Sequence, residues 1–329
     1  MGVKLAKNGR KWIMALAAIG AAALTTVQGG AASAKSLTHA TEVMNWFAEP
    51  EQGGQWDAQM NGYFKAQGLQ MTTQQGGPQV SAIPLVAAGK ATFGMSSADS
   101  ILLARQQGIP IVAVFADFQV DPQVLIWHAG QPIKGFQNFN GHPVYVSSSS
   151  PYWQFLLRKY RLAHAQTLTY TGSLVNFVQN QRSIIQGYAT EEPYTLSHQG
   201  VKIHYELIAR SGFDPYQNVM FTTEKEIKLH PAVVRAFVRA TQLGWKNYLA
   251  HPAPTDAFMK TYAPDLIPAA MLYAVKQATP LVKGGYAATH GIGYMTAARW
   301  NLLAAQMKGA GMLPKNFKAT GAFTDQFLP

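Results

Sequence analysis

Hydrophobic and polar residues switch repeatedly along the chain between the spacing of strands and that of helices. Residues 37–47 are predicted to form a strand, and residues 54–67 a helix in which Trp56, Met60 and Phe64 share one face. Short apolar runs bounded by Gly, Pro or Ser indicate more strands. The further predicted strands are 69–73, 91–95, 109–116, 124–128, 143–146, 167–170, 184–189 and 201–208. The same analysis predicts helices at 80–88, 152–160, 174–180 and 231–249.

Repeated strand–helix–strand units are typical of parallel sheets covered by helices. The alternation restarts near residue 143, which favours two α/β lobes, each a mostly parallel sheet flanked by helices. The stretches 119–132 and 211–217 are expected to cross between the lobes. A double crossing makes the first lobe discontinuous, with residues 35–125 and 217–329, and leaves 126–216 for the second lobe.

The first 34 residues have the order of a secretory signal peptide. Lys4, Lys7, Arg10 and Lys11 precede an apolar run at 12–24, and a small-x-small site ends at Ala34. The run is shorter than the roughly 20 residues that span a bilayer, so cleavage is favoured over an anchor. We therefore expect cleavage after Ala34 and a periplasmic product without stable membrane insertion, since no cysteine is present to carry a lipid.

The charge balance says little about the solute. The chain has 27 basic and 16 acidic residues, a net charge of +11, and loss of the four basic leader residues leaves +7. A basic surface favours anionic solutes or membranes, but the sole dense basic run, Arg158-Lys159-x-Arg161, is typical of an outer helix face. We therefore expect no nucleic acid partner. We also expect a monomer. Its core needs no disulfide, because 48% of the residues in the chain are hydrophobic.

Polar and aromatic residues follow the predicted strands, where ligands of open parallel sheets bind. Trp46 is expected to stack on a flat ring or to belong to the core, and the serines to contact ligand or only to cap helices. Gly53 and Gly54 are expected to bring a helix N-terminus close to the ligand. The candidate ligand-binding residues are Asn45, Trp46, Gln52, Gln55, Ser96, Ser97, Ser149, Tyr152, Tyr188 and Glu192.

Glu191 and Glu192 are expected to point apart, because neighbouring residues on a strand end face opposite sides. One of them would accept hydrogen bonds from an amino-substituted ring or a cation, and the other would be solvated. Catalytic patterns are weak: the sequence has no cysteine, no G-x-S-x-G and no paired histidines, and "GKATFG" is not a phosphate loop. We expect a binding protein without cofactor or metal.

Three segments resemble one family of binding proteins. The segments are "NWFAEPEQGGQW…GYFKAQGL", "LVAAGKATFGMSSADSILLARQQGIPIVAVFA" and "SIIQGYATEEPY", within residues 40–220. They are similar to periplasmic solute-binding proteins of the thiamine-pyrimidine-precursor type, grouped with nitrate-, taurine- and sulfonate-binding proteins. The resemblance implies a type II periplasmic binding protein fold and partnership with an ABC permease and its ATPase.

The resemblance also implies roles for individual residues. Asn45 and Trp46 would contact the edge and face of the ligand ring, and Glu192, beside Tyr188, would accept hydrogen bonds from a ring amine. The sequence departs from the family at Gln52, where histidine is usual, at Gln55-Trp56, where Phe-Tyr is usual, and at Glu191, where serine is usual. These departures leave the pyrimidine ligand open.

Three functions follow from these observations. The first is an importer receptor whose lobes close over a small, flat, pyrimidine-like heterocycle. The second keeps the fold but binds an aliphatic sulfonate, nitrate or another small anion at helix N-termini; the net charge favours it, and Glu192 disfavours it. The third is a secreted acid–base enzyme that uses Glu191 or Glu192.

Overall fold

Two five-stranded sheets organise the protein. The computed structural model describes residues 36–77, 79–147 and 150–329, and all ten strands below lie within them. The first sheet has the order β2 (Leu69–Gln74), β1 (Thr38–Val43), β3 (Phe93–Ser96), β10 (Gln217–Thr223) and β4 (Ile111–Phe118). The second has the order β7 (Gln166–Thr169), β6 (Pro143–Val146), β8 (Ile184–Tyr188), β5 (Gln123–His128) and β9 (Ile203–Leu207).

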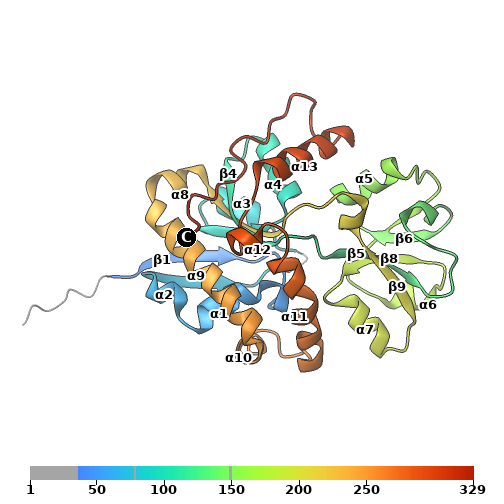
Figure 1. The fold of residues 1–329 in the computed structure, drawn as a ribbon, viewed down its shortest axis with the longest axis horizontal. Coiled ribbons are helices and arrows are strands. Elements are labelled where there is room, and N and C mark those ends of the chain that lie inside the picture. The colour runs from blue at the N-terminus through green and yellow to red at the C-terminus, as the bar shows by residue number, and fades with distance from the viewer. Residues whose placement is uncertain (1–35, 78, 148–149) are drawn as a thin grey trace, which may run out of the picture. The chain divides into compact units, whose positions relative to one another are not determined.

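Each sheet has four strands in one direction and one strand reversed. β10 is antiparallel to both β3 and β4 in the first sheet, and β5 is antiparallel to both β8 and β9 in the second. In Figure 1 the blue-to-cyan start and the orange-to-red end of the chain surround the first sheet, and the green middle surrounds the second. The predicted α/β class with two helix-flanked sheets is confirmed.

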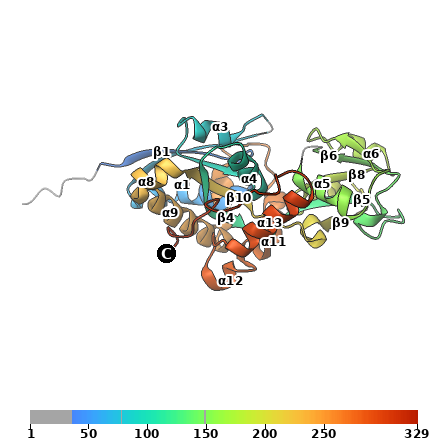
Figure 2. The ribbon, with the colours of Figure 1, turned by 90° about the horizontal axis from the view of Figure 1, so that it is seen from above.

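Helices cover both faces of the first sheet. Those that begin before β5 are α1 (Gly53–Met60), α2 (Tyr63–Ala66), α3 (Ala82–Ala87) and α4 (Ala98–Gln106). Those that follow β10 are α8 (Glu224–Leu229), α9 (Pro231–Ala250), α10 (Pro252–Met259), α11 (Pro268–Lys283), α12 (Ala287–His290) and α13 (Ala297–Gly309). Residues of α3, α4 and α13 pack in one core cluster and residues of α1, α9 and α11 in another; Figure 2 shows α3 and α9 on opposite faces.

In the second sheet, β5 is buried on both faces. The helices of the second sheet are α5 (Pro151–Lys159), α6 (Val175–Gln179) and α7 (Glu192–His198). The chain also has short 3₁₀ turns: η1 (Pro50–Gln52) follows β1 of the first sheet, whereas η2 (Phe136–Asn138) follows β5 and η3 (Ile208–Ser211) follows β9. Along β5, Val124 and Ile126 pack with α6 and α7, whereas Leu125 and Trp127 pack with α5 and η2. Because both alternating sets of side chains are buried, the strand is an unbroken apolar run rather than an alternation of apolar and polar residues. Within the described residues, no helix has the length and apolarity needed to cross a membrane.

Two predicted elements are shorter than expected, and a glycine interrupts one of them. The helix predicted at 54–67 is wrong as a single element: it breaks at Gly62, whose φ of 68° lies in the left-handed region, into α1 and α2. The strand predicted at 37–47 ends at Val43, where its pairing with β2 ends. Beyond it, Gly76 packs so tightly that a Cβ there would lie 2.3 Å from the Met44 carbonyl oxygen.

Gly53 and Gly54 serve helix packing rather than a ligand. A Cβ on Gly53 would lie 1.9 Å from the Tyr248 ring, and one on Gly54 would lie 2.2 Å from the Trp245 ring. On the facing helix, a Cβ on Gly244 would lie 1.9 Å from the Gly54 carbonyl oxygen. The expectation that the glycines bring a helix end to the ligand is therefore wrong, because α9 occupies the space that they leave.

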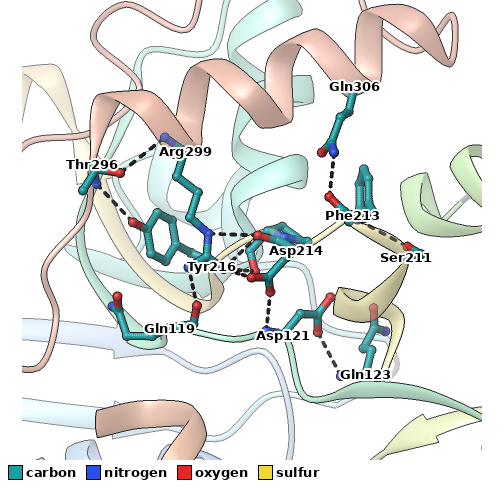
Figure 3. Close-up of polar contacts among 12 residues, drawn as sticks. Gln119, Asp121, Gln123, Ser211, Phe213, Asp214, Tyr216, Thr296, Arg299 and Gln306 are labelled. Atoms are coloured by element: carbon teal, nitrogen blue, oxygen red, sulfur yellow. Dashed lines mark hydrogen bonds and ion pairs between the residues drawn. The ribbon is translucent and has the colours of Figure 1, made fainter. Parts of the chain in front are cut away.

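Two short segments carry the chain between the sheets, and we call them the crossover segments: 119–122, after β4, and 212–216, before β10. They are bonded to each other, since the Asp121 backbone N–H donates to Asp214 Oδ1 at 2.8 Å. Arg299, on α13, binds both of them (Figure 3). Its guanidinium donates to the Gln119 and Asp214 carbonyls, pairs with Asp214 Oδ2 at 2.9 Å and lies 4.1 Å from the Tyr216 ring centroid.

Replacement of Arg299 tests how much these contacts stabilise the protein. Hydrogen bonds to charged groups contribute about 1.5–3 kcal/mol, so we expect Arg299→Met to lower the free energy of unfolding by that amount. Arg299→Lys should restore only part of the loss, because an ammonium cannot reproduce the planar fork. Urea denaturation followed by circular dichroism measures both. Arg239→Met, at an exposed position of α9, is the control, and an equal loss there would contradict the assignment.

Candidate ligand-binding site

Both sheets contribute residues to one cavity of about 450 Å³. Its volume lies within the range of about 300–1,000 Å³ typical of small-molecule sites. The lining residues near the first sheet are Asn45, Trp46, Glu49, Glu51, Gln52 and Asn218. Those from the second sheet and its connections are Gln123, Tyr170, Gly172, Leu174, Gln186, Gly187, Tyr188, Glu191, Glu192 and Thr195. Most lining residues follow or end a strand, where the carboxyl ends of parallel strands leave space for a ligand.

Side-chain amides connect the part of the lining near the first sheet. Gln52 Nε2 donates to Asn45 Oδ1 at 3.3 Å, and Asn45 Nδ2 donates to Asn218 Oδ1 at 2.8 Å. Asn218 Nδ2 in turn donates to the Glu51 carbonyl at 2.7 Å. Asn218 has a φ of 48°, a left-handed conformation that Asn tolerates better than most residues. The network fixes the η1 turn, and with it Glu51, against the start of β10.

Glu192 organises the part of the lining from the second sheet. Its Oε2 accepts from the Tyr188 backbone N–H at 2.6 Å, and its Oε1 accepts from the Tyr170 hydroxyl at 3.2 Å. This placement needs glycine at 187, because a Cβ there would lie 2.7 Å from the Glu192 carboxyl carbon. The carboxylate is therefore held in place before any ligand arrives.

Four carboxyl groups crowd the cavity, and each has a raised pKa. Glu191 is exposed as a whole residue, but desolvation of its carboxyl group beside the cavity, and then the charges of Glu192 and Glu51, raise its pKa to about 8. Burial also raises the pKa of Glu192 to about 7, against the lowering effect of its hydrogen bonds. Burial and the charges of the other three carboxylates raise the pKa of Glu49, and burial raises that of Glu51. Such a set of groups can exchange protons near neutral pH.

The structure brings five of the ten predicted site residues to this cavity. Asn45, Trp46, Gln52, Tyr188 and Glu192 all line it. Trp46 is partly exposed and packs edge-on against Phe47, with ring centroids 5.6 Å apart. Direct contact of these residues with a ligand stays a prediction.

The other predicted site residues lie elsewhere. Gln55 is buried and donates from Nε2 to both carboxylate oxygens of Asp117, at 3.0 and 2.9 Å. Ser96 ends β3, and Ser97 precedes α4 and donates to the Ser100 hydroxyl at 2.9 Å. Tyr152 is buried on α5 and reaches the cavity only through Gln186, to which its hydroxyl donates at 2.7 Å. Ser149 lies outside the described residues.

Sequence reasoning did not find several lining residues. Glu49 and Glu51 stand beside Gln52 in the stretch that suggested the site, and their acidity was the available signal. Asn218 had no such signal, because it belongs to β10, far along the chain. The expectation that Glu191 and Glu192 sit on a strand end is wrong: β8 ends at Tyr188, and Glu192 begins α7. Among the described residues, no group of three His, Asp or Glu is arranged to hold a metal ion.

The chain is similar in sequence to a family of known proteins. The family model described as NMT1/THI5 like matches residues 50–255. The riboflavin-binding protein RibY of Chloroflexus aurantiacus is 25% identical over 312 residues, which are 89% of this chain and 87% of RibY.

Solved structures share the fold at low sequence identity. The periplasmic aliphatic sulphonate binding protein SsuA from Escherichia coli is 12% identical and superposes with a TM-score of 0.68 over 87% of this chain and 92% of SsuA. The desulfurization enzyme DSZB is 10% identical and superposes with a TM-score of 0.58 over 88% of this chain and 97% of the enzyme. At these identities the superpositions establish the fold alone.

Two substitutions at Asn218 separate its backbone role from its hydrogen bonds. Both Asn218→Ala and Asn218→Gly remove the two amide hydrogen bonds, but only glycine adopts a positive φ without strain. We expect the free energy of unfolding of the alanine variant to be lower than that of the glycine variant by about 1–2 kcal/mol. The midpoints of urea unfolding measure the difference, and equal midpoints would contradict a strained backbone at this position.

The raised pKa values predict how stability depends on pH. A carboxyl group whose pKa is raised by folding favours the folded state less as pH increases, because the unfolded chain ionises first. For Glu191 the loss begins near the ordinary value of 4.5 and is complete above about 8. Glu191→Gln should therefore raise the melting temperature at pH values above this window and leave it unchanged below it.

Asp265→Asn is the matched control, since it removes an exposed carboxylate outside the cavity. The control should not change the difference between the melting temperatures at low and high pH. A similar change in both variants would show that overall charge, rather than crowding in the cavity, governs the effect.

Proposed function

The chain belongs to the NMT1/THI5-like family, and from this premise we propose that it is the extracytoplasmic solute receptor of an ABC importer. The observation that carries the proposal is the cavity to which both sheets contribute aromatic and hydrogen-bonding side chains. A protein with this fold can close over a solute when its hinge segments bend. The partners are then a permease and its ATPase, and the signal peptide directs the chain to the periplasm.

A flat heteroaromatic solute fits the lining best. Trp46, Tyr170 and Tyr188 offer aromatic faces, and Asn45 and Glu192 offer hydrogen-bonding groups to a ring edge. RibY is named for riboflavin, which has a flat heteroaromatic ring system. A pyrimidine-like ring presents the same chemistry on a smaller scale. Either solute gains from stacking and from hydrogen bonds to groups that are already held in place.

An aliphatic sulfonate is the second candidate, because SsuA shares the fold. Four carboxyl groups face the cavity, and none of its lining residues among those described is Lys, Arg or His. A sulfonate carries a permanent negative charge and would meet these carboxylates without a compensating cation. The lining therefore argues against an anionic solute.

Acid–base catalysis is the third candidate. The raised pKa of Glu191 and of Glu192 is typical of groups that transfer protons, and DSZB is an enzyme with this fold. Binding without turnover accounts for the same residues through hydrogen bonds alone. Native mass spectrometry of freshly purified protein distinguishes the two: an unchanged co-purified solute supports the receptor, and conversion of an added solute supports the enzyme.

The identity of the solute class is tested by calorimetry with riboflavin, an aminopyrimidine and an alkanesulfonate. We expect binding of a flat ring and none of the sulfonate. Trp46→Ala should weaken ring binding about tenfold, because stacking adds about 0.5–1.5 kcal/mol beyond the burial of the ring. Thermal unfolding should change little, since Trp46 is partly exposed.

Tyr286→Ala is the control, because it removes an exposed aromatic ring outside the cavity. Its ring affinity should match that of the unchanged protein. Equal losses of affinity and stability in Trp46→Ala would make the indole a core residue. Binding of the sulfonate alone would replace the proposed function by the second candidate.

A further inference from the structure

We propose that the solute of this cavity is a cation, with a positive charge attached to or conjugated with its flat ring. This inference rests on the proposed function, and it adds the charge of the solute to its shape. It depends on the acidic and aromatic residues that line the cavity, and on the absence of Lys, Arg and His among its described lining residues.

The cavity concentrates acidic groups from two distant parts of the chain. Glu49 and Glu51 come from the turn after β1, and Glu191 and Glu192 come from the start of α7. The ion pairs between described residues are Arg105 with Glu224, His230 with Glu226, and Arg299 with Asp214. None of the four cavity carboxyl groups belongs to these pairs, although the whole chain carries a net charge of +11.

Glu51 provides the second observation. It is 6% exposed and lines the cavity, and the groups that lower the pKa of its carboxyl are the Thr190 hydroxyl and its own backbone N–H, neither of which is a cation. Glu192 accepts two hydrogen bonds. A buried carboxylate without a cationic partner is costly unless a charged ligand pairs with it.

Aromatic rings complete a site for an organic cation. Trp46, Tyr170 and Tyr188 line the same cavity as the carboxyl groups. The face of an aromatic ring attracts a cation, and the attraction is stronger where water is excluded. A flat cation could therefore stack on a ring while its charge is neutralised by Glu51 and its neighbours.

The competing explanation keeps the solute neutral. In that case the carboxyl groups hold protons and donate hydrogen bonds to ring nitrogens or carbonyls. The two explanations differ in their response to pH. A cation binds the ionised carboxylates, so its affinity rises as pH increases and binding releases protons, whereas a neutral acceptor loses its donors over the same range.

A set of three matched probes tests the charge directly. Nicotinamide is neutral, its ring N-methylated derivative is a cation, and nicotinate is an anion, while all three share one flat ring. We expect calorimetry at millimolar concentrations to give an affinity for the cation about tenfold above that for nicotinamide, and no binding of nicotinate. The cation affinity should rise from about pH 5.5 to about pH 8.5 with release of protons.

The titrating groups that face one another across this range are Glu49, Glu51, Glu191 and Glu192, with the hydroxyls of Tyr170 and Tyr188 beside them. Glu51→Gln keeps the shape of the side chain and should remove most of the preference for the cation, with little effect on nicotinamide. Glu49→Gln is a second variant in case the first fails to fold. Asp265→Asn, outside the cavity, should leave the preference unchanged.

The outcomes separate this inference from the proposed function. Stronger binding of nicotinamide than of its cation, or failure of the cation to bind, overturns the positive charge. If riboflavin or an aminopyrimidine still binds in that case, the receptor for a neutral flat ring stands. Absence of binding by every flat ring, whatever its charge, overturns both.

Discussion

The contact of Arg299 with both crossover segments is the constraint on which the rest of the structure depends. The two segments are the places where the chain leaves one sheet and returns to it, and a single guanidinium on α13 binds the Gln119 and Asp214 carbonyls together. Asp121 adds a direct bond between the segments. The segments join the sheet that contains β1 to the sheet that contains β8, and residues after β1 and at the end of β8 line one cavity.

Ionised carboxyl groups in the cavity cost stability. Desolvation raises the pKa of all four carboxyl groups, and repulsion adds to the rise at Glu49, Glu191 and Glu192, so the site disfavours ionisation of all four. Glu192 is stabilised by Tyr170 and by the Tyr188 backbone, and Gly187 gives it space. Natural proteins retain such unfavourable groups mainly at functional sites. The acidic lining is thus more informative about function than the fold, which sulfonate receptors and an enzyme share.

Much of the fold and part of the site could be predicted from the sequence. The alternation of strands and helices is a local pattern, and the two-sheet α/β architecture followed from it. Asn45, Trp46 and Gln52 could be found because they lie in the polar stretch between β1 and the next helix. Gln55 could not be excluded, since only its burial against Asp117 separates it from its neighbour Gln52. Asn218 could not be found, because it meets Asn45 only after β10 returns to the first sheet.

The sequence by itself indicated the nine strands from β1 to β9 and the acidic pair at Glu191 and Glu192, because each depends on residues close together in the chain; it did not indicate β10. Only the tertiary structure decided that Gly53 and Gly54 face α9 and that carboxyl groups about 140 residues apart share one cavity. The physical reason is that burial and charge crowding depend on distances in space. Side chains that neighbour each other across two sheets leave no periodic mark in the sequence.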